Sequence, residues 1–120
     1  MDQTPTLYER LGGETGIKGL LVAFYGRVLA DPVLRPFFSD IPMDKLLRMQ
    51  HEFFAMALDG PQRYTGRQLA EVHHGRGITM AHFHRFQQHL LETLQETGVP
   101  ADDIHDVIRR VVSHRRDVIG

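Results

Sequence analysis

The sequence contains no cysteine. This absence excludes disulfide bonds, thiolate zinc sites, iron–sulfur clusters and thioether attachment of a haem group. An excess of positive charge is also missing, because the net charge is −1 and the isoelectric point is about 6.7. Nucleic acids and anionic membranes select basic surfaces, so we expect neither as a partner.

Long apolar runs are missing as well. No stretch approaches the roughly 20 apolar residues of a membrane span, and residues 1–6 have neither the basic region nor the apolar run of a signal peptide. We therefore expect a cytoplasmic protein. Strand signals are weak and no linker or repeat interrupts the chain. The sequence thus predicts an all-α fold and a single domain over residues 1–120, with 1–6 as a loose N-terminal segment.

Apolar residues at three-and-four spacing predict the helices, and glycine and proline mark their ends. Thr79 is predicted as an N-cap and Gly98 as a C-terminal stop, and Pro36 is expected to interrupt a short helical turn. Short helical segments are predicted at 7–11, 33–38 and 67–73, and longer helices at 14–30, 43–58, 79–97 and from 100 onward.

His73 ends one of the short helical segments, directly before a glycine-containing break. It shares a helical face with Leu69 and Val72, whereas His74 is rotated by about 100°. We therefore expect His73 to face inward, where a neutral imidazole in an apolar cavity is suited to ligate haem iron. The alternative is a histidine bonded to a carbonyl at a helix C-terminus, and local spacing alone favours that alternative.

Tyr25 and Gln50 each lie on the otherwise apolar face of a predicted long helix. A buried phenol or amide costs free energy unless it is hydrogen-bonded. The two groups can satisfy each other, or they can aim donors into a cavity and stabilise the negative charge on bound dioxygen. Alternatively, the Tyr25 hydroxyl reaches solvent and Gln50 is an interface amide. Taken singly these alternatives are favoured, but together with His73 they lose weight.

Phenylalanines and further histidines give weaker signals. The phenylalanines fit an ordinary core, although a flat cofactor also needs planar walls; they are Phe24, Phe37, Phe38, Phe53, Phe54, Phe83 and Phe86. His114 shares an apolar helical face with three valines, and a partly buried histidine with a backbone partner is the favoured interpretation. His82, His84 and His89 lack the spacing of zinc ligands and are interpreted as surface residues.

Several segments, in their order and spacing, resemble group I truncated haemoglobins, the short two-over-two helical globins of bacteria, algae and protists. The resemblance runs from about residue 7 to residue 119. It is carried by Leu7-Tyr8-Glu9-Arg10-Leu11-Gly12-Gly13, Phe24-Tyr25-Gly26-Arg27-Val28-Leu29-Ala30-Asp31, Phe37-Phe38, Gln50, Tyr64-Thr65-Gly66, Val72-His73-His74-Gly75-Arg76-Gly77-Ile78 and Gly98-Val99-Pro100.

The resemblance implies a two-over-two helical sandwich that encloses haem b, and it implies roles for individual residues. His73 matches the proximal iron ligand. Tyr25 and Gln50 match the distal pair that hydrogen-bonds dioxygen, and Leu46 matches the residue over the ligand. Further residues expected to contact the haem, with Phe38 packed flat on it and Phe54 gating an apolar tunnel, are Phe24, Phe38, Met49, Phe53, Phe54, Arg76, Ile78 and Phe83.

Three positions lie where members of the family differ from one another or from this sequence. Met49 stands where some family members have a histidine as sixth iron ligand, so that form of bis-histidine haem is not expected. Asp59-Gly60 replaces a glycine pair, which is expected to alter the central loop. His114 matches a histidine that in the cyanobacterial type can bond covalently to a haem vinyl group, and is a candidate for the same cross-link.

The function implied is reversible binding of dioxygen and other diatomic ligands, including nitric oxide and carbon monoxide, by a monomer. Nitric oxide dioxygenation and weak peroxidase activity are left open, and each would need a separate reductase, because no flavin or nicotinamide domain is evident. The alternatives are a haem-based redox or sensing protein, a cofactor-free helical interaction module and, ranked last, a non-haem metal site built from histidines.

Overall fold

All regular structure in the described part of the chain is helical. The structure is a computed structural model that describes residues 5–60 and 78–113. It contains α1 (Leu7–Arg10), α2 (Gly13–Ala30), the 3₁₀ helix η1 (Arg35–Phe37), α3 (Met43–Ala57), α5 (Met80–Glu96) and α6 (Ala101–Ser113). Within those two ranges there is no strand, and the all-α prediction is confirmed.

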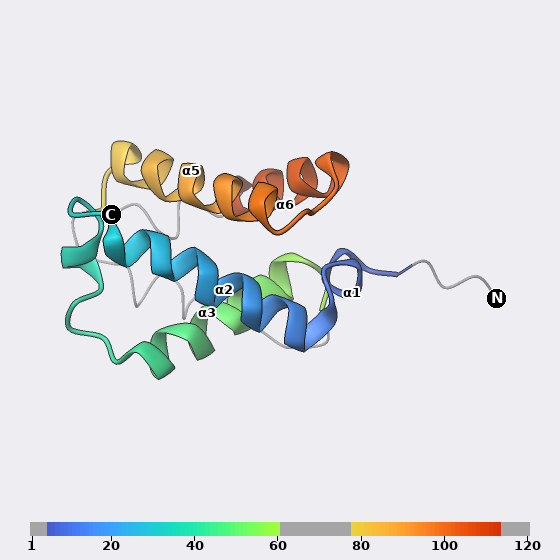
Figure 1. Cartoon of the computed structure of the whole chain (residues 1–120), viewed down its shortest axis with the longest axis horizontal. Helices are drawn as coiled ribbons and strands as arrows, with labels where there is room; N and C mark the ends of the chain where they lie inside the picture. Colours follow the sequence, from blue (N-terminus) through green and yellow to red (C-terminus); the bar gives the residue numbers. More distant parts are fainter. Residues whose placement is uncertain (1–4, 61–77, 114–120) are drawn as a thin grey trace.

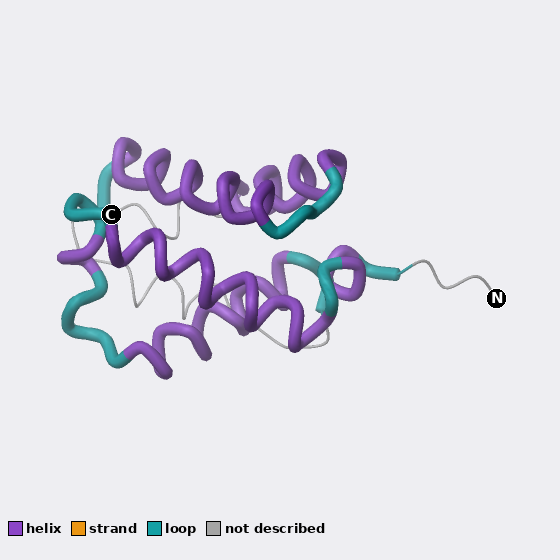
Figure 2. The backbone as a smooth tube through the Cα atoms, in the orientation of Figure 1, coloured by secondary structure: helices purple, strands orange, loops and turns teal. Residues whose placement is uncertain are grey.

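The long helices form two layers. α2 and α3 lie in one layer, and α5 and α6 lie in the other (Figures 1 and 2). α2 packs against both α3 and α5, and α5 packs against α6. The predicted two-over-two helical sandwich is therefore confirmed, and the inner faces of all four helices meet between the layers.

Helix ends follow from local chemistry. Gly12 and Gly13 have φ values of +99° and +63°, a left-handed conformation that glycine adopts without steric cost, and they separate α1 from α2. The Thr79 hydroxyl accepts a hydrogen bond from the backbone N–H of His82 at 3.3 Å and caps α5. Gly98, with φ +78°, lies just past the other end of α5. The capping and stop predictions for Thr79 and Gly98 are thus confirmed.

The prediction that Pro36 interrupts a helical turn is wrong. Pro36 lies inside η1, at the start of that 3₁₀ helix. Proline is tolerated there because the first backbone N–H groups of a helix have no intrahelical partner, so the missing donor breaks no bond. η1 therefore carries the chain from α2 towards α3 without losing a hydrogen bond at Pro36.

The core consists of the apolar helix faces that the sequence pattern predicts. Its fully buried large side chains, from α1, α2, α3, α5 and α6, include Leu7, Ile17, Leu21, Phe24, Tyr25, Leu46, Phe54, Leu90, Leu94 and Val107. Leu29, near the C-terminal end of α2, is half-buried. None of the helices placed by the structure is long and apolar enough to cross a membrane.

Candidate functional site

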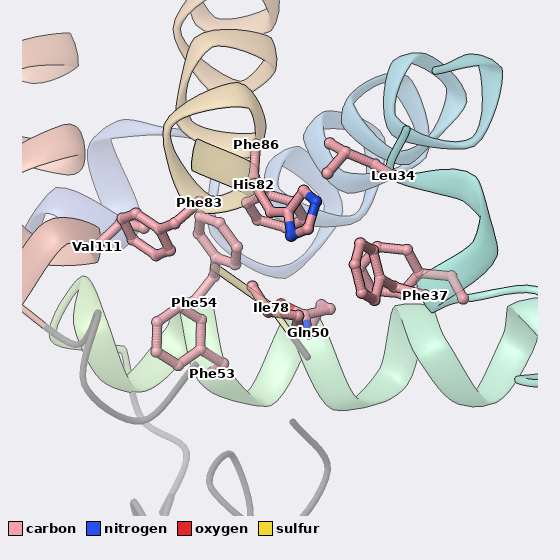
Figure 3. Close-up of a pocket in the computed structure, with 11 residues that line it drawn as sticks. Leu34, Phe37, Gln50, Phe53, Phe54, Ile78, His82, Phe83, Phe86 and Val111 are labelled. Atoms are coloured by element: carbon pink, nitrogen blue, oxygen red, sulfur yellow. The ribbon is translucent and has the colours of Figure 1, made fainter. Parts of the chain in front are cut away.

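A pocket with aromatic walls lies between the two helical layers. It is bounded by η1, by α3, and by α5 with the residue before its cap, and α6 contributes one valine (Figure 3). Its lining residues are Leu34, Phe37, Phe38, Gln50, Phe53, Phe54, Ile78, His82, Phe83, Phe86 and Val111. Every one of them is apolar except Gln50 and His82, so the pocket offers few polar contacts.

The structure brings most of the described sequence-predicted site residues to this pocket. Six of the residues expected to contact a ligand line it: Phe38, Gln50, Phe53, Phe54, Ile78 and Phe83. Phe24, Tyr25 and Leu46 are fully buried in the adjoining core, and Met49 is half-buried on α3. The predictions for His73, Arg76 and His114 fall outside the described residues.

Tyr25 is the most unusual polar residue near the pocket. Its side chain is 0% exposed, and its ring packs edge-on against Phe38 and Phe86, with ring centroids 5.7 and 5.9 Å away. Among the described residues its hydroxyl has no hydrogen-bond partner. Burial raises the pKa of Tyr25 well above its ordinary value, so the hydroxyl stays protonated and remains a donor.

Two alternatives for Tyr25 are thereby wrong. The hydroxyl does not reach solvent, because the side chain is completely buried. It is also not satisfied by Gln50, since it has no partner in the described part of the chain. Gln50 itself is 4% exposed and lies on the α3 wall of the pocket (Figure 3). This part of the structure therefore holds a buried donor without a described partner and a buried amide.

The aromatic rings form the flat walls that a planar ligand requires. Phe38 and Phe86 are stacked, with an interplanar angle of 29° and centroids 6.2 Å apart. Phe24 meets Phe86 edge-on at 4.8 Å, and Phe53 meets Phe54 edge-on at 5.4 Å. These contacts fix the rings through α2, α3 and α5 at once. An apolar planar cofactor that presents a small polar ligand to a protonated donor fits this set of groups.

His82 was missed by the sequence reasoning. It was expected on the surface, but it is half-buried, lines the pocket, and lies edge-on to the Phe37 ring with centroids 4.8 Å apart. Its position three residues after Thr79 was the available signal, because this is the spacing at which a side chain reaches back to a capping residue. His84 is exposed, as expected.

His89 was also expected on the surface, and that interpretation is wrong. Its Nε2 lies 2.7 Å from the carboxylate of Asp31, a buried residue at the end of α2. The same carboxylate accepts hydrogen bonds from Arg85 Nε at 2.5 Å and from the Val33 backbone N–H at 2.9 Å. The hydrogen bond from Arg85, followed by the others, holds the pKa of Asp31 well below its usual range. This cluster fastens the corner between α2 and η1 to α5.

The described residues offer no competing metal centre. Within residues 5–60 and 78–113, no group of three histidine, aspartate or glutamate side chains is arranged to hold a metal ion. The polar side chains that line the described pocket are Gln50 and His82, and Tyr25 lies in the adjoining core.

Two crossed pairs of helices around an apolar aromatic pocket define the class of two-over-two globins. Comparison with known proteins identifies the family. Residues 6–119 match the family described as bacterial-like globin. This chain is 43% identical over 103 residues to the group 1 truncated hemoglobin GlbN of Mycolicibacterium paratuberculosis. The aligned residues cover 86% of this chain and 76% of that protein.

Solved structures agree. The truncated hemoglobin of Tetrahymena pyriformis in its Fe(III) form superimposes with a TM-score of 0.88 and 35% identity, covering 97% of this chain and 99% of that one. The 2/2 hemoglobin of a Synechococcus species, in the cyanomet state and with covalently attached heme, gives 0.88 and 36%, covering 96% and 98%. The chain belongs to the bacterial-like globin family and is of the group 1 truncated haemoglobin type, which confirms the resemblance found in the sequence.

Proposed function

We propose that this protein binds haem b and that the bound haem reversibly takes up dioxygen and other diatomic gases. The observation that carries the proposal is the fully buried Tyr25 hydroxyl without a described partner, beside an apolar aromatic pocket. An unsatisfied buried polar group costs about 1–3 kcal/mol. Such a cost is expected at a binding site, where a ligand supplies the missing partner.

The residues of the pocket have distinct proposed tasks. Haem iron supplies the bond to the gas. Tyr25 donates a hydrogen bond to the gas, and its raised pKa keeps that proton in place at physiological pH. Gln50 provides a second polar contact, and Leu46 covers the gas from α3. The surrounding phenylalanines keep water out, which strengthens these hydrogen bonds.

We propose His73 as the residue that holds the iron. Residues proposed to contact the haem are Phe24, Phe38, Met49, Phe53, Phe54, Arg76, Ile78 and Phe83. We also propose His114 as the site of a covalent link to a haem vinyl group, in view of the covalently attached heme of the Synechococcus relative. Retention of haem after acid-acetone extraction of the reduced protein supports this link, and clean loss of haem contradicts it.

Further properties are proposed on the same basis. We propose a cytoplasmic monomer with one domain over residues 1–120. Nitric oxide dioxygenation is the proposed enzymatic role, and it requires electrons from a separate reductase. A redox or sensing role uses the same pocket. A cofactor-free helical interaction module is the competing function, in which the pocket is simply part of the core.

Absorption spectroscopy of the purified protein, ferric and ferrous, tests the central proposal. We expect a Soret band that shifts on addition of carbon monoxide or dioxygen. His73→Ala is expected to abolish the native spectrum, whereas His84→Ala, which changes an exposed histidine on α5, is expected to leave it intact. A wild-type protein that folds but takes up no added haem contradicts the proposal and favours the interaction module.

A further inference from the structure

The polar groups that line the pocket sit on opposite walls. Gln50 projects from α3 and is 4% exposed, so it belongs to the interior. His82 projects from the first turn of α5 into the same pocket (Figure 3), and the residue is only half-buried, so part of it remains exposed. The other lining residues are apolar. Among the described lining residues, His82 is thus the one polar side chain that is partly exposed, and we call its position the rim of the pocket.

The capping interaction of α5 fixes the tautomer of His82. Its Nδ1 accepts a hydrogen bond from the backbone N–H of Thr79 at 3.1 Å, while the Thr79 hydroxyl accepts from the His82 N–H. Nδ1 must therefore keep its lone pair, and the neutral ring carries its hydrogen on Nε2. Glutamate or glutamine usually fills this position of a capping box. Histidine performs the same capping and additionally presents an N–H donor on its other side.

The Nε2–H donor of His82 is held in a fixed orientation and has no acceptor among the described residues. The Phe37 ring lies edge-on to the imidazole at 4.8 Å, so the ring is fixed from η1 as well as from Thr79. No described residue accepts a hydrogen bond from Nε2. An oriented N–H group at the rim of an apolar pocket is suited to an anionic group on the edge of a ligand.

We infer that His82 positions the haem by donating a hydrogen bond from Nε2 to one of its carboxylate side chains. The inference rests on the proposed haem-binding function. Protoporphyrin is apolar over most of its surface and carries its carboxylates on one edge, so the apolar interior and the polar rim of this pocket match it. Gln50, deep in the pocket, is left to contact the gas.

The rate of haem loss to an excess of a haem-scavenging apoglobin tests this role. His82→Glu keeps the capping box but replaces the donor with a carboxylate. We expect haem loss to be about tenfold faster, which corresponds to the loss of one charge-assisted hydrogen bond. His82→Gln keeps both the cap and an amide donor and should stay close to wild type. His84→Glu makes the same charge change at an exposed site of α5 and should have no effect.

Haem dimethyl ester separates a contact with the carboxylate from a general packing role. With esterified haem, His82→Glu should lose the cofactor at the wild-type rate, because the acceptor is no longer charged. An unchanged rate with ordinary haem, or an equal acceleration with both haems, overturns the inference. If the wild-type protein binds neither haem, the proposed function itself is contradicted. If the wild type binds haem and His82→Glu loses it at the same rate, only the role of His82 is contradicted. Thermal unfolding of the apoproteins verifies that each variant is folded.

Discussion

Two buried tyrosines illustrate opposite uses of the same side chain. Tyr8, on α1, is 5% exposed, and its hydroxyl lies 3.4 Å from Nε2 of His51 on α3. Tyr25, on α2, is 0% exposed, and its hydroxyl has no described partner. Burial raises the pKa of both phenols. The Tyr8 hydroxyl on α1 is paired, whereas the Tyr25 hydroxyl beside the pocket has no described partner and is the group that we propose contacts a ligand. Burial alone therefore does not distinguish the two tyrosines, whereas the presence or absence of a described hydrogen-bond partner does.

Tyr25→Phe is expected to give the largest effect. Losing a hydrogen bond to a strongly polarised ligand, worth roughly 1.5–3 kcal/mol, should raise the dioxygen dissociation rate by about one to two decades. Stopped-flow displacement of dioxygen by carbon monoxide measures this rate. Tyr8→Phe is the matched control, because it removes the same atom from a residue that does not line the pocket and should leave the rate unchanged. Equal rates for wild type and Tyr25→Phe would show that the hydroxyl does not face the gas.

Asp31 extends the comparison to a buried group with several partners. Asp31→Asn keeps the shape but removes the charge that Arg85 and His89 contact, so the thermal midpoint should fall clearly. Because the folded-state pKa of Asp31 is depressed, its contribution to stability is present above the ordinary value of 3.8 and declines as the pH falls below it. The gap between wild type and variant should thus be full at neutral pH and shrink on acidification.

Calorimetry between neutral and strongly acidic pH measures that gap. Asp102→Asn, an exposed aspartate at the start of α6, serves as the charge-matched control and should change the midpoint far less. A gap that stays constant down to strongly acidic pH would mean that the carboxylate of Asp31 is not held in its charged form by the fold.

Tyr8→Phe and Tyr25→Phe also differ in their effects on the apoprotein. The first variant loses a buried hydrogen bond and leaves His51 without that partner, so unfolding free energy should fall by about 1 kcal/mol. The second removes a hydroxyl that has no hydrogen-bond partner among the described residues, so the free energy of unfolding should stay the same or rise slightly. Urea unfolding of both apoproteins measures the difference. Equal losses would indicate that the Tyr25 hydroxyl is also satisfied in the folded protein.

The helices could be predicted from sequence because their causes are local. The spacing of apolar residues, the Thr79 cap and the stop at Gly98 all act within one or two helical turns. The placement of Tyr25 and Gln50 on otherwise apolar helix faces was predictable for the same reason. The contacts of His89 and Arg85 with Asp31 were not, because they join residues 58 and 54 positions apart. Whether a buried group is paired depends on such distant partners, which no local pattern specifies.

Asp59 offers a further comparison between a paired side chain and the backbone that carries it, with the smallest expected effects. It stands in the turn after α3, where the sequence resemblance places a glycine, and it adopts φ +64°. The unfavourable left-handed backbone is accompanied by a hydrogen-bonded ion pair, since Arg110 Nη1 lies 2.8 Å from the Asp59 carboxylate. The same guanidinium donates to the Ala57 carbonyl at 3.0 Å and so holds the end of α3. The departure from glycine is therefore tied to a contact with α6.

Asp59→Gly relieves the backbone but loses the ion pair. The ion pair contributes about 1 kcal/mol or less, because the Asp59 side chain is 63% exposed and exposed pairs contribute little. Relief of the left-handed backbone is worth a similar amount, about 1 kcal/mol or less. The two changes oppose each other, so unfolding free energy should stay within roughly 0.5 kcal/mol of wild type. Asp59→Ala loses the pair and keeps the φ that the wild type already has, so it should cost about 1 kcal/mol or less. Urea unfolding that ranks alanine well below glycine would show that the backbone conformation, rather than the paired carboxylate, dominates at this turn; equal losses would assign the effect to the pair with Arg110.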